Sequence, residues 1–260
     1  MTIIFIPIWD GSNGCASFIV GDDSDGRGIV VDPLATFGAD SYILNAAEVG
    51  LKIVGVIETH VHADHHSVAR ELAQKADLLV SMGYRAPLAE AFNPLHEGEQ
   101  FDLGGVKVKV LETPGHTPES ISLVVTDETR SPDPWLVLSG DSLFVGDVGR
   151  PDLVDPTPEL TDQAALDQFH SVHDKILALP DTTELYPAHY GASACGGLFL
   201  SPKPISTIGY ERRWNRFAQI TEPQQFVQEL LSLLKPPPPD AAAIRRQNLG
   251  ELSTNQEGGN

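Results

Sequence analysis

Cysteine is scarce in this sequence: only Cys15 and Cys195 occur among its 260 residues. Two cysteines cannot build the disulfide framework of a small secreted protein, and such scarcity is typical of a reducing compartment. Long apolar runs are lacking too, because no stretch reaches the roughly 20 residues that a membrane-spanning helix needs. The first residues also lack the basic leader and the cleavage site of a signal peptide. We therefore expect a cytoplasmic protein without a membrane partner.

Positive charge is the second shortage. The chain has 17 Lys and Arg against 36 Asp and Glu, which gives a formal net charge of −19. This excess of negative charge argues against nucleic acid and anionic membrane surfaces as partners, because both would repel it. Hydrophobic residues make up 41% of the chain, so it can bury one large core.

The C-terminal residues differ from the rest in composition. An amphipathic helix is predicted at 226–234, and the four prolines at 236–239 end it because proline donates no helix hydrogen bond. We expect a catalytic domain over 1–235, followed by a proline-rich linker and flexible tail over 236–260. A short helix at 241–246 is the alternative for part of that tail.

Hydrophobic patterning predicts a protein of mixed strands and helices. Apolar runs and alternating stretches predict strands near 2–9, 15–20, 28–32, 53–57, 78–81, 106–112, 120–126 and 135–139. Helical spacing predicts helices near 38–49, from the His-rich segment to about residue 75, and at 159–178. His96, His170 and His173 are expected to be packing or surface residues rather than ligands.

A His-rich segment follows the apolar strand at 53–57. Four of the nine histidines lie within residues 59–66, beside Asp64. Residues two apart on an extended chain point the same way, so His60 and His62 are expected to converge on one ion. Asp64 and His65 are expected to begin the next helix, where a polar side chain also serves as a cap.

Three later strands also end in a residue that can bind metal. His116 follows the strand at 106–112, Asp141 follows the strand at 135–139, and His189 follows a short stretch at 184–186. Taken together with the His-rich segment, they form a set of N and O donors suited to a hard or borderline divalent ion. The complete set of seven candidates is His60, His62, Asp64, His65, His116, Asp141 and His189.

In order and spacing these seven residues resemble the metal-site signature of the metallo-β-lactamase fold family. The resemblance covers most of the chain and implies an α/β fold of the αββα type. In that fold two mixed sheets pack face to face, helices cover their outer faces, and the metal lies at one edge.

A finer resemblance lies downstream. Segments 140–153 and 187–196 are similar to the persulfide dioxygenase branch, and 206–215 is similar to bacterial members that are often fused to rhodanese domains. No rhodanese domain follows here, so the chain resembles only the catalytic part. Functional coupling to a separate rhodanese, and a homodimer, are left open. Tyr190 departs from the pattern, since a small residue is more usual there.

Two activities are compatible with this ligand set. By resemblance, His60, His116 and Asp141 bind one Fe(II) in a dioxygenase that oxidises glutathione persulfide or a similar small persulfide with O2 to sulfite and thiol. The other four candidates then hold ligands and waters by hydrogen bonds. The alternative is a hydrolase of thioesters similar to glyoxalase II. Its two Zn(II) ions are held by His60, His62 and His116 and by Asp64, His65 and His189, with Asp141 as the bridge.

The substrate-binding residues are less well indicated. Arg150 is the leading candidate to anchor an anionic thiol, with Arg212 and Arg213 behind it. Arg150 is equally expected to hold its own loop through Asp147 or Asp152. Tyr190 is expected to reshape the pocket near His189. Cys195 is either a thiol near the pocket that relays persulfide sulfur or a small apolar filler.

Overall fold

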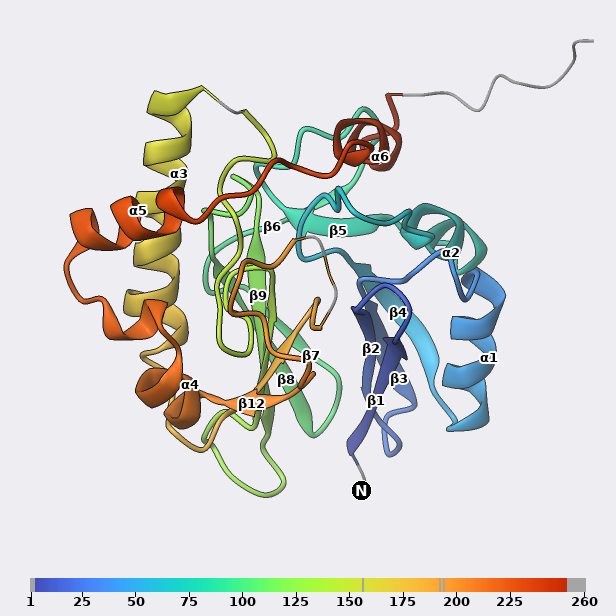
Figure 1. Cartoon of the computed structure of the whole chain (residues 1–260). Helices are drawn as coiled ribbons and strands as arrows, with labels where there is room; N and C mark the ends of the chain where they lie inside the picture. The colour runs from blue at the N-terminus through green and yellow to red at the C-terminus, as the bar shows by residue number, and fades with distance from the viewer. Residues whose placement is uncertain (1–2, 156, 192, 194, 252–260) are drawn as a thin grey trace, which may run out of the picture.

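The computed structural model describes residues 3–155, 157–191, 193 and 195–251. The chain forms two strand-rich halves, and helices flank each half (Figure 1). The strands are β1 Ile3–Asp10, β2 Cys15–Asp22, β3 Arg27–Val31, β4 Lys52–Ile57, β5 Val80–Gly83, β6 Asn93–Leu95, β7 Gln100–Asp102, β8 Val106–Glu112, β9 Ile121–Asp127, β10 Leu136–Gly140, β11 Glu184–Pro187 and β12 Ser206–Thr207. The α-helices are α1 Ala39–Glu48, α2 Ala69–Lys75, α3 Pro158–His170, α4 Ile208–Trp214, α5 Pro223–Ser232 and α6 Ala241–Asn248.

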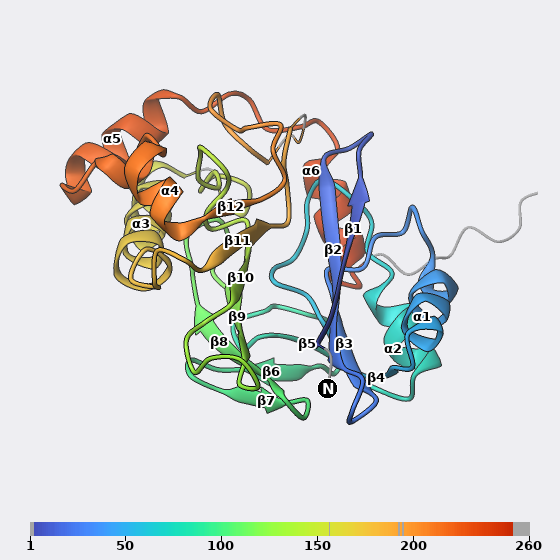
Figure 2. The same cartoon turned by 90° about the horizontal axis from the view of Figure 1, so that it is seen from below.

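The strands form two six-stranded sheets, one in the order β1-β2-β3-β4-β5-β6 and the other in the order β12-β11-β10-β9-β8-β7. Both sheets are mixed: β3, β4, β5 and β6 pair in parallel in the first, and β10 pairs in parallel with β11 in the second. Figure 2 shows α1 and α2 outside the first sheet and α3 and α5 outside the second. The expected αββα sandwich is therefore confirmed.

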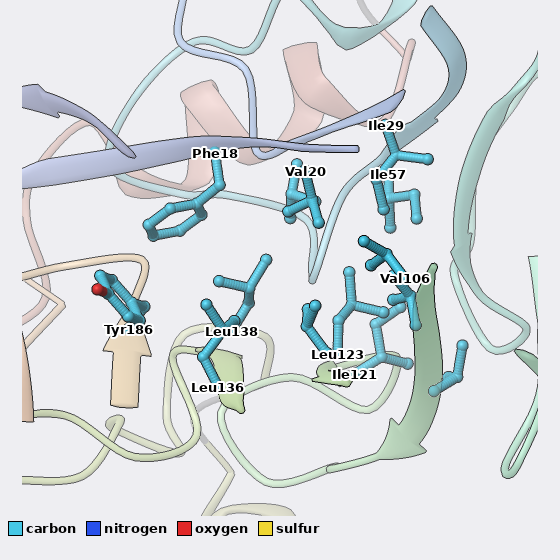
Figure 3. Close-up of a cluster of buried hydrophobic side chains, with 14 of the residues drawn as sticks. Phe18, Val20, Ile29, Ile57, Val106, Ile121, Leu123, Leu136, Leu138 and Tyr186 are labelled. Atoms are coloured by element: carbon cyan, nitrogen blue, oxygen red, sulfur yellow. The ribbon is translucent and has the colours of Figure 1, made fainter. Parts of the chain in front are cut away.

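The core between the sheets is built from the inward-facing side of each strand. Phe18, Val20 and Ile29 of the first sheet face Leu123 and Leu138 of the second (Figure 3). On β10, Leu136 and Leu138 point inward while Val137 packs with the helices outside. Both faces of this strand are buried, which explains why it is a continuous apolar run.

The outer faces are closed by amphipathic helices. Tyr42 of α1 and Leu72 of α2 pack against Val30 on the first sheet, and Phe169 of α3 and Phe226 of α5 pack against the second. None of the helices that the structure describes is long and apolar enough to span a bilayer.

Most predicted elements agree with the structure to within a few residues, and three differences stand out. Asp64 and His65 do not begin a helix, because α2 starts only at Ala69. The helix predicted at 159–178 changes at Ser171–Ile176 into a π-helical turn. The strands β6, β7 and β12 and the helix α4 were not predicted.

The structure describes the C-terminal residues as far as Glu251. The short helix allowed at 241–246 is present as α6. The rest of the predicted flexible tail, residues 252–260, lies outside the described residues.

Candidate metal centre

Four strands deliver the candidate ligands to one edge of the sandwich. Within the second sheet β8 and β10 are both antiparallel to β9, and β11 is parallel to β10, so β8, β10 and β11 end at the same edge. Hydrogen bonds join the loops there: the amide of Ile121 donates to the carbonyl of Thr59, and the amide of Ala188 donates to Gly140. The His-rich segment after β4 is thereby fixed against the second sheet.

His60, His116 and Asp141 form a compact buried triad. Asp141 Oδ2 lies 3.6 Å from His60 Nε2 and 3.3 Å from His116 Nε2, and one ligand atom from each residue lies within 4.8 Å of the others. His60 Nε2 and Asp141 Oδ2 are buried and have no hydrogen-bond partner among the described residues. Buried polar atoms are normally paired, so these converging, unpaired donors fit a metal ion.

The orientation of both imidazoles is set by their other ring nitrogen. His60 Nδ1 lies 3.0 Å from the hydroxyl of Thr59, which itself donates to Asp32 Oδ2 and so accepts from the ring. His116 Nδ1 donates to the carbonyl of Arg150 at 2.8 Å. Each ring therefore carries its proton on Nδ1 and directs the lone pair of Nε2 into the triad, as a metal ligand must.

The charges of the triad also suit coordination. Burial, together with the nearby His62, lowers the pKa of His60 well below its usual value, and burial likewise lowers the pKa of His116. Burial opposes ionisation of Asp141, but the surrounding His189, His60 and His116 outweigh it and hold the pKa of this carboxyl well below its usual range. Two neutral imidazoles and one carboxylate are the donors that a divalent ion such as iron accepts.

A second group of donors lies beside the triad. His189 bridges two carboxylates, with Nδ1 2.6 Å from Asp141 Oδ1 and Nε2 2.7 Å from Asp64 Oδ2. His65 Nδ1 lies 3.0 Å from Asp64 Oδ1. Burial disfavours a charged His189, but Asp141 and Asp64 overcome this and raise its pKa well above the usual value. The ion pair engages Asp141 Oδ1 and leaves Oδ2 to the triad.

Cys15 belongs to this second group, and sequence reasoning missed it. Its sulfur lies 3.6 Å from Asp64 Oδ2, and its ligand atom lies within 4.8 Å of those of Asp64, His65 and His189. Cys15 is the first residue of β2 and forms an isolated antiparallel bridge with His189. No local motif marks this cysteine, because the contact depends on how the two sheets meet.

The structure does not bring His62 into the triad. His62 Nε2 lies 3.2 Å from Asp32 Oδ1 and 3.0 Å from Glu58 Oε2, in a separate buried group. The two-residue alternation ends with β4 at Ile57, and Nε2 of His62 points to Asp32 and Glu58 rather than to the triad. The other ring nitrogen of His62, Nδ1, is buried and has no hydrogen-bond partner among the described residues, so convergence of His60 and His62 on one ion stays a prediction. Burial disfavours a charged imidazole, but Asp32 and Glu58 raise the pKa of His62 well above its usual value.

Arg150, the leading candidate for substrate anchoring, holds its own loop in the structure. Arg150 is 7% exposed and pairs with Asp152 through Nε at 2.7 Å and Nη2 at 2.8 Å. Asp147 accepts instead from the amides of Val148 and Phe199. Of the two loop-holding partners expected for Arg150, the structure selects Asp152, and substrate anchoring by Arg150 stays a prediction.

The other arginines lie away from the triad. Arg212 binds Asp181 and the carbonyls of Leu177 and Leu179, all of which precede β11 and so lie at the opposite edge of the sheet. Arg213 is exposed on the same helix, α4. Neither arginine is placed to anchor a substrate at the triad.

Tyr190 and Cys195 lie close to His189. The Tyr190 ring packs edge-on against Trp9 at a centroid distance of 5.5 Å. Cys195 is 2% exposed, and its ligand atom lies within 4.8 Å of those of Asp141 and His189. The thiol therefore lies beside the metal-binding residues, as a role in relaying persulfide sulfur would require.

Helix α6 supports the His-rich segment from outside (Figure 1). Asn248 Nδ2 donates to the carbonyls of His62 and His65, both at 2.9 Å, and its Oδ1 accepts from the amide of Ser67. Sequence reasoning missed Asn248, because a polar residue near the end of a chain carries no sign of its distant partners.

An Asn248→Asp protein should be less stable than the wild type. The carboxylate keeps the acceptor for Ser67 but loses both donors, and it faces two carbonyl oxygens. Leaving such groups unpaired costs about 1–3 kcal/mol in the free energy of unfolding. Urea denaturation measures the change. Gln247→Glu makes the same amide-to-acid change on an exposed side chain of α6, so equal stability of the two variants would contradict the supporting role.

Comparison with known proteins agrees with this geometry. The family profile described as "Metallo-beta-lactamase superfamily" matches residues 10–189. Mouse (Mus musculus) "Persulfide dioxygenase ETHE1, mitochondrial" is 29% identical over 241 residues, which cover 90% of this chain and 84% of the relative.

Two crystal structures extend the comparison. A metallo-beta-lactamase from Staphylococcus aureus is 31% identical with a TM-score of 0.87, over 98% of this chain and 75% of the other. ETHE1 from Myxococcus xanthus is 25% identical with a TM-score of 0.78, over 95% of this chain and 99% of the other.

Proposed function

Since the chain belongs to the metallo-beta-lactamase superfamily, we propose that it is a non-haem iron dioxygenase acting on a low-molecular-weight persulfide. The observation that carries the proposal is the triad of His60, His116 and Asp141, set apart from His62. Two imidazoles and one carboxylate on one face of Fe(II) leave positions open for a substrate and O2. The names of the mouse and Myxococcus relatives support the same activity.

The overall reaction consumes one O2 and one water for each persulfide. The S–S bond of R–S–SH breaks, the terminal sulfur is oxidised to sulfite, O2 is reduced, and the thiol R–SH is released. When bound, the iron supplies a site at which the persulfide anion and O2 meet. Glutathione persulfide is the substrate that we propose, with one iron per chain.

The protein's own residues prepare this site. Thr59 and the Arg150 carbonyl hold the protons of His60 and His116 on Nδ1, so that both Nε2 atoms remain available. His189 Nδ1 donates to Asp141 Oδ1 at 2.6 Å, which limits Asp141 to one free oxygen, and His189 Nε2 faces Asp64 Oδ2. The triad is buried, and a buried site keeps water from competing for an anionic persulfide.

The alternative is a two-zinc thioester hydrolase. The ligand atoms of Asp64, His65 and His189, which this hydrolase needs for its second ion, lie close together beside Cys15. It also needs His62 on the first ion with His60. The two rings are neighbours, but His62 Nε2 faces Asp32 and Glu58, and the ligand atoms of His62 group with these carboxylates rather than with the triad. The dioxygenase therefore agrees better with the arrangement of side chains.

Oxygen uptake distinguishes the two activities. Iron-loaded protein should consume O2 when glutathione persulfide is added, form sulfite in proportion, and consume none with glutathione alone. Lactoylglutathione should be hydrolysed poorly, since a thioesterase needs only water and its metal-bound hydroxide. Efficient anaerobic hydrolysis of lactoylglutathione, without persulfide-dependent O2 uptake, would falsify the dioxygenase proposal.

A further inference from the structure

Glu58 lies two residues before His60 and is only 4% exposed. Its Oε2 lies 3.0 Å from His62 Nε2, and its Oε1 accepts from the hydroxyl of Ser67. Apart from the ion pair with His62, Oε2 has no hydrogen-bond partner among the described residues. The free-energy cost of burying this carboxylate is thus offset mainly through His62.

Asp32 is the second carboxylate that contacts His62, and it also binds Thr59. It accepts the amide of Thr59 at 2.7 Å and the hydroxyl of Thr59 at 2.8 Å, in addition to its contact with His62. Asp32 is therefore needed to shape the turn that presents His60. Glu58 makes no such contact with Thr59, so its role can be tested separately.

His62 is close enough to the metal-binding residues for its position to matter. The His62 ring centroid lies 4.1 Å from that of His60 and 4.2 Å from that of His65. His62 Nδ1 is buried and has no hydrogen-bond partner among the described residues, so a modest rotation of the imidazole would add this nitrogen to the donors of His60 and His116. Three histidines form the donor set of a catalytic zinc site, and Asp141 would then be free to bridge two ions.

We propose that Glu58 is a positioning residue that holds His62 away from the metal, and that it thereby restricts the centre to one ion bound by two histidines and Asp141. The inference rests on the proposed single-metal site. It does not depend on which persulfide is the substrate. Breaking a buried ion pair is costly, and this cost is what keeps the imidazole in place.

Metal titration of a Glu58→Ala protein tests the inference without an activity assay. Apoprotein is titrated anaerobically with Co(II) and with Zn(II). The number of ions per chain is measured, and the visible spectrum of bound Co(II) reports its coordination. We expect one ion per chain in the wild type and two in Glu58→Ala, with tighter zinc binding and a changed Co(II) spectrum. If Glu58 only supported a metal ligand, its replacement should instead lower the metal affinity, by about 10–100-fold.

Two further variants show whether His62 causes the change. The double variant Glu58→Ala/His62→Ala should return to one ion per chain. Asp22→Asn alters another buried carboxylate, which accepts from Ser24 and from the amide of Gly105 and does not contact the His-rich segment, and it should behave as wild type. Glu58→Gln, nearly isosteric with the native residue, replaces Glu58→Ala if circular dichroism shows that the alanine protein is unfolded.

Three outcomes would overturn the inference. The first is weaker zinc binding by Glu58→Ala with an unchanged Co(II) spectrum. The second is a gained ion that persists without His62. The third is a wild-type protein that binds two ions and loses one in Glu58→Ala, which would make Asp32, Glu58 and His62 a cation site of their own. Oxygen uptake by the wild type with glutathione persulfide is measured separately, so failure of the proposed function is distinguished from failure of this inference.

Discussion

An Asp141→Ala protein should hold almost no iron and show no persulfide-dependent oxygen uptake. Asp141 is the only anionic member of the triad, and the two neutral histidines that remain cannot balance the charge of a divalent ion. Changes to residues that merely support a ligand already cost 10–100-fold in metal affinity, so loss of the carboxylate itself should cost at least ~100-fold. Iron analysis of anaerobically purified protein, combined with an oxygen electrode, measures both effects.

Asp141 also neutralises His189, so its removal affects the fold as well as the metal. Removing one partner of a buried ion pair costs about 3–5 kcal/mol. His116→Ala leaves the Asp64–His189–Asp141 contacts in place and therefore separates loss of metal from loss of stability. Asp127→Asn provides a matched control, because this buried carboxylate lies at the far end of β9 and binds only Thr129 and Arg130 among the partners described. Two tightly bound zinc ions, with activity restored by zinc, would contradict the assignment of iron.

A Gly149→Ala protein should lose both stability and metal. A Cβ at Gly149 would lie 1.9 Å from the carbonyl oxygen of Asp141 and 3.1 Å from Cβ of His116. The backbone must move to make room, and that movement shifts two members of the triad at once. Overpacking of this kind costs about 1–3 kcal/mol, and here it also lowers iron occupancy. Chemical denaturation and iron analysis of the same preparation measure the two effects.

Gly11→Ala is the matched control for this change. A Cβ at Gly11 would meet no atom within 4 Å, so the same substitution should leave stability and iron content near those of the wild type. A Gly149→Ala protein with normal iron content would show that the backbone at residue 149 can move without displacing Asp141 or His116.

The sequence predicts the parts of this molecule that depend on local pattern. The alternation at 106–112 predicted β8, and the apolar run at 135–139 predicted β10 to within one residue. The seven candidate ligands lie at one edge because they belong to the segments that follow β4, β8, β10 and β11, and strands of like direction end together.

The features that were missed depend on contacts between distant segments. Asp32 and Asn248 look like ordinary polar residues until the fold brings them to the His-rich segment. Glu58 is only four residues from His62, but no recognised motif marks this pair. Cys15 meets His189 only where the two sheets join. The strand β6 contains Pro94 and has only three residues, too few for a period to be visible.

Contacts of the His-rich segment with the far end of the chain bear on the order of events during synthesis. His60 leaves the ribosome first, whereas His189 and Asn248 follow much later. At a rate of about 5–20 residues per second, this delay is on the order of ten seconds. During that interval His60 lacks Asp141 and His189, and the carbonyls of His62 and His65 lack Asn248. Stable capture of metal is therefore a late step, which follows assembly of both sheets and docking of α6. A ribosome-bound chain arrested before residue 189 should remain metal-free in the presence of iron.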